Sequence, residues 1–143
     1  MKRVIKIGII GFGTVGRGVY ELVNRNSRTI YSKSGIEIQI RAVCDLEASR
    51  LAHCAGIKTT DRWQDITEDD EIDITVELIG GIHPAKDIIL DSLQRGKNVV
   101  TANKKLIAEQ GAEILEAISQ TGGSIGFEAA VGGGIPCIMA LQK

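Results

Sequence analysis

The feature that most constrains the fold is a set of three glycines between two segments of different periodicity. Residues 4–10 form an apolar run rich in Val and Ile, which is typical of a buried strand. Gly11, Gly13 and Gly16 follow immediately. Apolar side chains then recur at helical spacing, at Val15, Val19, Leu22 and Val23. The pattern predicts a strand that passes directly into a helix through a glycine-rich turn.

Each glycine has a separate physical role in such a turn. Gly11 permits the tight turn, Gly13 leaves room for a phosphate to approach the backbone, and Gly16 lets the helix pack close to the strand. The free N–H groups and the positive end of the helix dipole then face the phosphate. The alternative is a merely flexible turn, and the strand before it and the helix after it argue against that. We therefore predict dinucleotide binding by residues Gly11, Phe12, Gly13, Thr14, Val15 and Gly16.

The alternation of strand and helix continues along the whole chain. Further strands are predicted at residues 36–44, 72–79, 98–101 and 124–128, with a short extended piece at 57–60. Helical patterns lie between them at 49–55, 83–95 and 106–118, whereas the polar residues 27–35 are expected to form a loop. Repeated βαβ units produce a mostly parallel sheet with helices on both faces. We predict one Rossmann-like, doubly wound α/β domain over residues 1–143.

The composition excludes several classes of partner. The chain has 143 residues, 43% of them hydrophobic, and a net charge of -1 with both signs scattered along it. It carries neither a basic stripe for nucleic acid nor a segment that would span a membrane. Its three cysteines, Cys44, Cys54 and Cys137, lack the spacing of a zinc site or a disulfide framework. A cytoplasmic protein with a small-molecule ligand is expected.

An acidic residue, Asp45, closes the second predicted strand. In dinucleotide-binding folds an acid at this position accepts hydrogen bonds from the adenosine ribose. It follows the glycines by more than the usual interval of about 20 residues, and the polar residues 27–35 account for the excess. Asp45 could instead cap the next helix, as Asp often does. We prefer the ribose contact.

Four segments, in order along the chain, resemble homoserine dehydrogenases. They are residues 8–16 (GIIGFGTVG), 77–81 (ELIGG), 99–104 (VVTANK) and 127–136 (FEAAVGGGIP). The first is shared with many dehydrogenases, whereas the last two are far more specific. The resemblance implies an NAD- or NADP-dependent oxidoreductase that interconverts L-homoserine and L-aspartate 4-semialdehyde, in the biosynthesis of threonine, methionine and isoleucine.

The resemblance also implies roles for single residues. Lys104 matches the lysine that lies between nicotinamide and substrate in the family and takes part in proton transfer. Such a base needs a lowered pKa, which a water-poor site or a positive nicotinamide can provide. The competing interpretation of Lys104 is a solvated lysine at a helix start. Gly80 and Thr101 are predicted to join Lys104 in binding the cofactor.

A monovalent-cation site is the second implication of the resemblance. In the family, a carboxylate and backbone carbonyls hold sodium, and here they match Glu128 and the carbonyls of Val131, Gly133 and Ile135. Hard oxygen ligands suit such an ion. The alternative is a flexible crossover connection.

Two departures from the family pattern affect the prediction. Many members carry arginine where this chain has Cys44, and such an arginine can pair with the 2′-phosphate of NADP. We therefore favour NAD, although Arg50 could supply the missing charge. Family members also continue into a catalytic and dimerisation domain, which is absent from this chain. We expect an N-terminal piece of a monofunctional, homodimeric parent, with little or no turnover alone.

Two other functions share part of this pattern. Another Rossmann dehydrogenase acting on an amino acid or an aldehyde would share the glycines and Asp45, but it should lack the combination of the last two segments. A non-catalytic nucleotide-binding or redox-sensing module would also share the glycines, but it needs no lysine near the nicotinamide.

Overall fold

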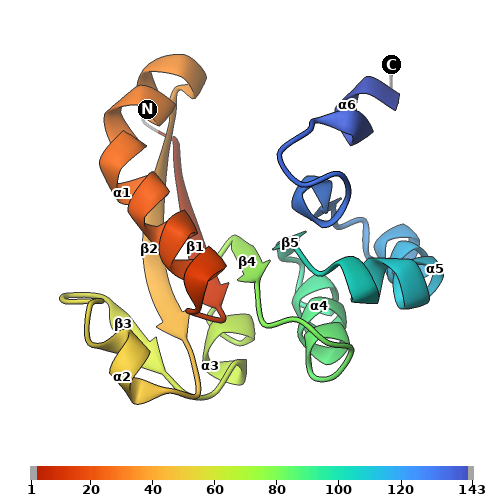
Figure 1. Cartoon of the computed structure of the whole chain (residues 1–143), viewed down its shortest axis with the longest axis horizontal. Coiled ribbons are helices and arrows are strands. Elements are labelled where there is room, and N and C mark those ends of the chain that lie inside the picture. Colours follow the sequence, from red (N-terminus) through yellow and green to blue (C-terminus); the bar gives the residue numbers. More distant parts are fainter. Residues whose placement is uncertain (1–2, 142–143) are drawn as a thin grey trace.

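The computed structural model describes residues 3–141, which form one six-stranded parallel sheet with helices around it (Figure 1). The strand order is β3-β2-β1-β4-β5-β6, and every neighbouring pair is parallel. The strands are β1 (Arg3–Ile10), β2 (Ile36–Cys44), β3 (Lys58–Thr60), β4 (Ile74–Glu77), β5 (Asn98–Thr101) and β6 (Ile125–Gly126). The order reverses between β1 and β4, which is where this class of fold binds ligands.

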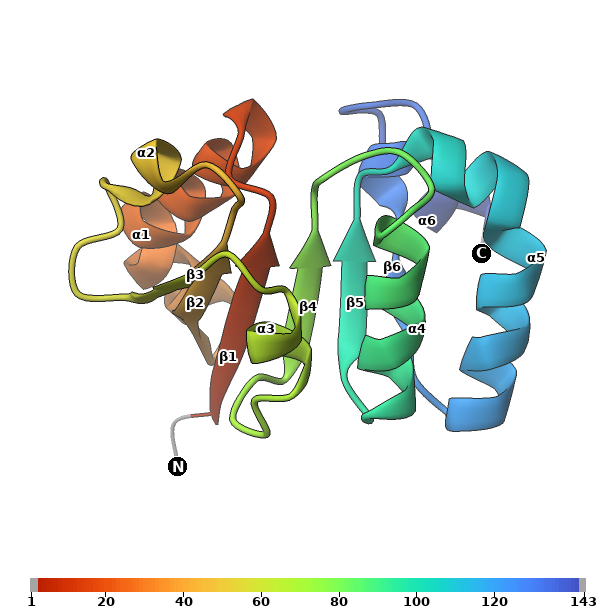
Figure 2. The same ribbon diagram turned by 90° about the horizontal axis from the view of Figure 1, so that it is seen from below.

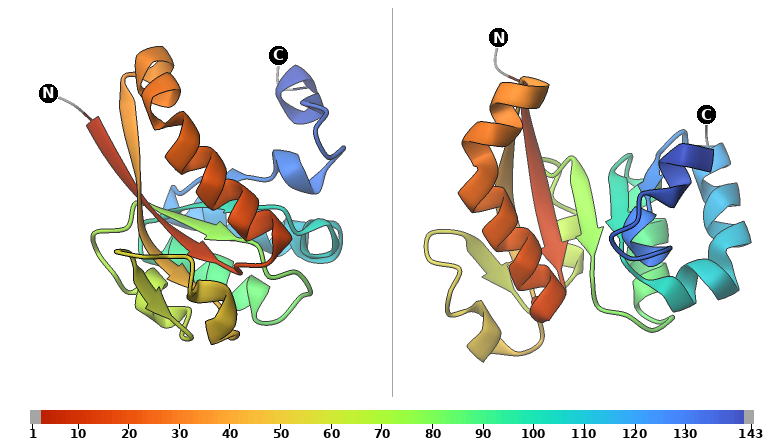
Figure 3. Two further views of the ribbon diagram at one scale, coloured as in Figure 1. Left: turned by 60° about the vertical axis from the view of Figure 1, so that its left-hand side comes forward. Right: turned by 45° about the horizontal axis from the view of Figure 1, so that its top comes forward.

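Helices cover both faces of the sheet, as predicted. They are α1 (Thr14–Ser34), α2 (Ala48–Leu51), α3 (Gln64–Thr67), α4 (Ala85–Gln94), α5 (Lys104–Thr121), a 3-10 turn η1 (Glu128–Ala130) and α6 (Cys137–Leu141). Figure 2 shows α3 and α4 on the face opposite α1, and Figure 3 shows α1 running along β1 and β2. None of the helices within residues 3–141 is long and apolar enough to cross a membrane.

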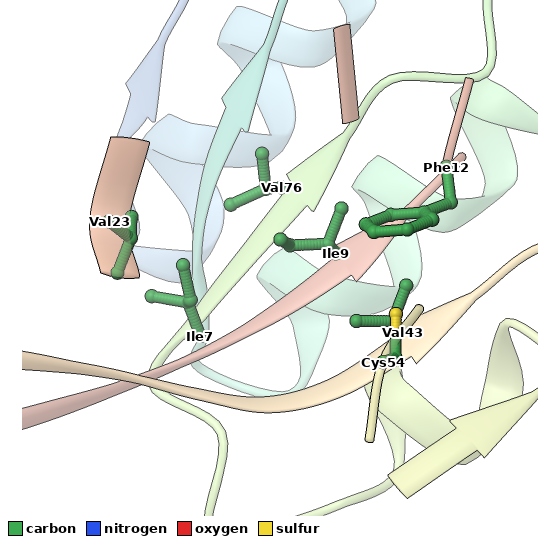
Figure 4. Packing of buried hydrophobic residues seen from close by; sticks show 7 residues of the cluster. All are labelled: Ile7, Ile9, Phe12, Val23, Val43, Cys54 and Val76. Carbon is green, nitrogen blue, oxygen red and sulfur yellow. The ribbon is translucent and has the colours of Figure 1, made fainter. Parts of the chain in front are cut away.

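The core is divided by the sheet because successive strand residues point to opposite faces. Ile9 of β1 and Val43 of β2 are fully buried on the side of α1, where they pack with Phe12 and Val23 (Figure 4). Ile10, the next residue of β1, belongs to the cluster on the other face, together with Ala42, Cys44, Ile66, Ile72 and Ile88. The central strands are therefore buried on both faces, which explains their continuous apolar character.

The predicted loop at residues 27–35 is wrong, because α1 continues to Ser34. Gly35 ends the helix in the left-handed conformation, with φ 70°, and its N–H donates to the Tyr31 carbonyl at 2.8 Å. The hydroxyl of Ser34 donates to the Ile30 carbonyl at 2.7 Å, and Ser32 similarly donates to Thr29. The serine hydroxyls are thus satisfied within the helix, and the segment has few apolar residues from which helical spacing could be predicted.

Strand ends also differ from the prediction. The segment 72–79 is a strand only from Ile74 to Glu77, because the N–H of Ile79 turns back to the Glu77 carboxylate. Glu128 begins the 3-10 turn and does not belong to β6. The short helix α3 was not predicted, since four residues are too few to show a period.

Candidate cofactor site

The glycine turn joins β1 to α1 with little free space around two of its glycines. Gly11 has φ +97°, and a Cβ there would lie 2.8 Å from the backbone carbonyl of Leu78. A Cβ on Gly16 would overlap the carbonyl oxygen of Gly11. Both positions therefore require glycine, one for the turn and one for close packing of α1, as the spacing predicted.

Gly13 differs from its neighbours because it faces open space. It is the N-cap residue of α1, where no side chain caps the helix, and the first turn carries no acidic residue. The nearest atom to a Cβ at this position is Nη1 of Arg50, at 3.9 Å. Thr14 and Val15 are exposed beside it, whereas the Phe12 ring is buried in the core. The free N–H groups of α1 can therefore meet an anion at Gly13.

Asp45 ties the end of β2 to the glycine turn. Its Oδ2 accepts the Phe12 N–H at 2.6 Å and lies 3.4 Å from Arg50, while its Oδ1 accepts the Glu47 N–H at 2.9 Å. Burial alone would raise the pKa of Asp45, but these two N–H donors and the Arg50 guanidinium outweigh burial and hold the pKa below its usual range. The N-cap residue of α2 is Glu47, and Asp45 accepts the Glu47 N–H, so Asp45 holds the turn before this helix without being its N-cap residue. The ribose contact stays a prediction.

A cleft of about 470 Å³ opens at the carboxyl ends of β1, β2 and β4. Its wall includes the predicted residues Gly11, Gly13, Asp45 and Gly80. Its charged residues are Asp45, Glu47, Arg50 and Asp61, and its apolar residues include Leu46, Trp63, Leu78, Ile79, Pro84 and Ile88. The cleft lies at the reversal of strand order, where it combines an apolar slot with carboxylates and a helix N-terminus.

Two predicted residues, Thr101 at the end of β5 and Lys104 at the start of α5, do not line this cleft. Thr101 is fully buried, and its hydroxyl donates to Glu77 at 2.6 Å. Lys104 is exposed as the first residue of α5, directly after the N-cap residue Asn103. Sequence reasoning missed Glu77 and Asn103 as site residues. Glu77 could have been found from the sequence, because it is a charged residue at the end of an apolar strand.

The segment predicted to hold a cation folds back onto the start of α6. A carboxylate oxygen of Glu128 accepts the Ile138 N–H at 3.2 Å. The Ile135 carbonyl accepts the Cys137 N–H at 2.8 Å, and the Val131 carbonyl lies 3.7 Å from the Cys137 sulfur. Gly133 adopts φ 62° between them. Three of the four predicted ligand residues thus have oxygens near residues 137–138, and each oxygen has a second lone pair. Across residues 3–141, His, Cys, Asp and Glu side chains form no group of three that could hold a metal.

The three thiols differ enough in environment to predict a labelling order. Burial, together with nearby Asp45, Asp61 and Asp65, raises the pKa of Cys44 to about 12, and burial also raises the pKa of Cys54. Cys137 is partly exposed. Because the thiolate is the nucleophile, iodoacetamide at neutral pH should modify Cys137 first, as located by peptide mass spectrometry. Urea-unfolded protein is the control, in which all three should react. Fast labelling of folded Cys44 would contradict the burial of its thiol.

The strand order, the glycine turn and the buried acid after β2 define a class of protein: this is a dinucleotide-binding domain. Comparison with known families narrows the class. Residues 11–128 match the family described as the homoserine dehydrogenase NAD-binding domain. The chain belongs to this family, which confirms the resemblance found in its sequence segments.

Relatives and solved structures agree with the family match. The chain is 40% identical over 141 residues to a homoserine dehydrogenase of Neisseria gonorrhoeae, covering 97% of this chain and 32% of the relative. A homoserine dehydrogenase structure from Thiobacillus denitrificans is similar with a TM-score of 0.92 and 41% identity, over 99% of this chain and 33% of that one. A hyperthermophilic archaeal homoserine dehydrogenase in complex with NADPH matches with a TM-score of 0.77 and 27% identity, over 96% of this chain and 48% of that one. The chain spans about a third of the length of the curated relatives.

Proposed function

We propose that this chain is the nicotinamide-dinucleotide-binding part of a homoserine dehydrogenase, which interconverts L-homoserine and L-aspartate 4-semialdehyde. The observation that carries the proposal is the cleft at the strand-order reversal, bounded by the glycine turn on one side and by Asp45 on the other. Asp45 would accept the adenosine ribose hydroxyls, and the N-terminus of α1 would hold the pyrophosphate at Gly13. The other half of the dinucleotide would then extend over the ends of β4 and β5.

The proposed catalytic residue of this chain is Lys104. The bound nicotinamide supplies a hydride acceptor for the alcohol carbon of homoserine. Oxidation also releases the hydroxyl proton, and the Lys104 amine would accept it. The position of Lys104 supports this role, because it begins α5 at the carboxyl edge of the sheet. Its side chain is exposed in this chain, as in the competing interpretation of a solvated lysine, and the bound cofactor and the rest of the parent enzyme would have to cover it. The rest of the parent enzyme would hold the substrate and form the homodimer, and the buried thiols Cys44 and Cys54 fit a reducing cytoplasm.

The experiment that tests this function joins residues 1–143 to the remaining two thirds of the Neisseria gonorrhoeae relative. Homoserine-dependent formation of NADH or NADPH is expected from the hybrid. Lys104→Ala should abolish most of it, by about a hundredfold or more, with cofactor affinity nearly unchanged. Lys105→Ala, which alters the next residue, is the matched control. A folded hybrid that binds the cofactor without turnover would favour a non-catalytic dinucleotide-binding module.

The charges of the cleft support a preference for NAD over NADP. Asp45, Glu47 and Asp61 contribute three carboxylates, and the single guanidinium of Arg50 is already paired with Asp45 at 3.4 Å and with Glu47 at 2.8 Å. A 2′-phosphate would enter a net negative environment there. Calorimetric titration should therefore give about tenfold tighter binding of NADH than of NADPH.

Glu47→Gln should reduce the preference for NADH over NADPH, because it removes one negative charge and one of the two carboxylates paired with Arg50. The exposed Glu116→Gln on α5 makes the same charge change and should leave the preference unaltered. Tighter binding of NADPH by the unmodified chain would contradict the charge argument and point to Arg50 as the phosphate ligand.

We further propose that Glu128 and the carbonyls of Val131, Gly133 and Ile135 hold a structural sodium ion. The clustering of three of these residues around residues 137–138 supports the site. Replacing sodium by choline at constant ionic strength should lower the thermal midpoint of the protein. An unchanged midpoint would contradict the proposed sodium site.

A further inference from the structure

Glu77 is a buried carboxylate that the proposed chemistry does not use. It is the last residue of β4, it is 0% exposed, and it stands beside Thr101 in the sheet register. Burying a charge is costly unless hydrogen bonds satisfy it. Its Oε1 accepts the N–H groups of Ile79 and Gly80 at 2.8 and 3.4 Å, and its Oε2 accepts the Thr101 hydroxyl at 2.6 Å. One side chain thus holds the turn after β4 and the end of β5 together.

Asn103 closes these contacts into a ring. Its backbone N–H donates to the Thr101 hydroxyl oxygen at 3.1 Å, and its side-chain amide donates to the Gly81 carbonyl at 2.7 Å. Its Oδ1 also accepts the Leu106 N–H and so caps α5. Glu77, the 79–81 turn, Asn103 and Thr101 therefore form a continuous hydrogen-bonded ring across two strand ends. Lys104 directly follows the ring.

The turn that Glu77 holds is suited to contact a flat ligand. Gly80 and Gly81 adopt φ 76° and 75°, and a Cβ at either position would have nothing within 4 Å. Both positions are therefore open backbone without side chains. Since the adenosine half is assigned to Asp45 and the pyrophosphate to Gly13, the nicotinamide half must pass over the ends of β4 and β5. The ring lies under that path.

We propose that Glu77 is a positioning residue for the nicotinamide half of the cofactor, fixing both the Gly80–Gly81 turn and the start of α5 that carries Lys104. This inference rests on the proposed cofactor site. It predicts that damage to the ring weakens ligands that contain nicotinamide and spares ligands that lack it.

The test compares NADH with ADP-ribose, which keeps the adenosine and the pyrophosphate but lacks the nicotinamide. Glu77→Gln is nearly isosteric, yet its amide has only one acceptor oxygen, so it cannot accept both the Thr101 hydroxyl and the N–H groups of Ile79 and Gly80. It should weaken NADH binding about tenfold and change ADP-ribose binding less than about twofold. The fluorescence of bound NADH, which reports the surroundings of its nicotinamide, should shift as well.

Two further variants keep the test decisive. Asn103→Ser retains a good helix cap but removes the bond to Gly81, so it should give the same selective loss. Ser92→Ala removes a different buried hydrogen bond to β4, the 3.0 Å contact with Thr75, and should leave both affinities unchanged.

The outcomes separate the two proposals. An equal loss for both ligands, or no loss for either, would overturn the positioning role of Glu77, as would equal affinity of the unmodified chain for NADH and ADP-ribose. Failure of the folded, unmodified chain to bind either ligand would instead overturn the cofactor site itself.

Discussion

Gly13→Ala is expected to weaken NADH binding about a hundredfold, because one or two charge-assisted hydrogen bonds to the pyrophosphate would be lost. A Cβ at Gly13 would stand where the pyrophosphate must approach the N-terminus of α1. The fold should tolerate it, because Gly13 has φ -74° and only Arg50 lies within 4 Å of the new atom. The thermal midpoint should therefore stay within about 2 °C of the original. Titration and thermal melting of the same preparation check both statements.

Gly18→Ala is the matched control for this variant. Gly18 lies in α1, five residues after Gly13, and a Cβ there would have nothing within 4 Å. The control should leave NADH affinity unchanged and raise stability by about 0.5–1 kcal/mol, since alanine is the better helix former. Undiminished NADH binding by Gly13→Ala would place the pyrophosphate elsewhere.

The second large effect is on stability and concerns Gly16. A Cβ on Gly16 would overlap the Gly11 carbonyl oxygen, and Gly11 is itself confined by the backbone of Leu78. The overlap cannot be relieved by rotating a side chain, so α1 must move away from the turn. Gly16→Ala should lower the free energy of unfolding by about 3 kcal/mol, the upper end of ordinary overpacking.

Urea denaturation of Gly16→Ala and Gly18→Ala, side by side, measures this effect. Both variants add one methyl group to the same helix, so helix propensity alone would raise the stability of both. A loss confined to Gly16→Ala would establish the close contact between helix and turn. Equal stability of the two variants would mean that the turn can yield.

The parts of the fold that were predictable depend on local patterns. The glycine turn could be located from three residues because its context, a strand before and a helix after, was also visible. Asp45 was found by its place at a strand end. The C-terminal part of α1 was missed because residues 27–34 are mostly polar, and Ile30 and Tyr31 alone do not form an apolar stripe.

The hydrogen-bonded ring could not be predicted in the same way. Glu77 and Thr101 are 24 residues apart, and their contact exists only because β4 and β5 lie side by side in a particular register. The sequence resemblance drew attention to both segments but described neither the contact nor its direction. Such pairings can be identified only from the three-dimensional structure, because the spacing of residues along the sequence does not show which strands are neighbours.

The strands on either side of β1, β2 and β4, end with the same hydrogen-bonded turn, in which a carboxylate accepts a backbone N–H. Asp45 after β2 and Glu77 at the end of β4 each accept the N–H of the residue two positions later, and between them lies the uncapped N-terminus of α1. Along this edge a carboxylate, the positive end of a helix dipole and a second carboxylate therefore follow one another. Oxidised NAD has the complementary profile, with uncharged adenosine hydroxyls, an anionic pyrophosphate and a cationic nicotinamide. The alternation of charge along the sheet edge would thus set the direction in which the cofactor lies as well as its affinity.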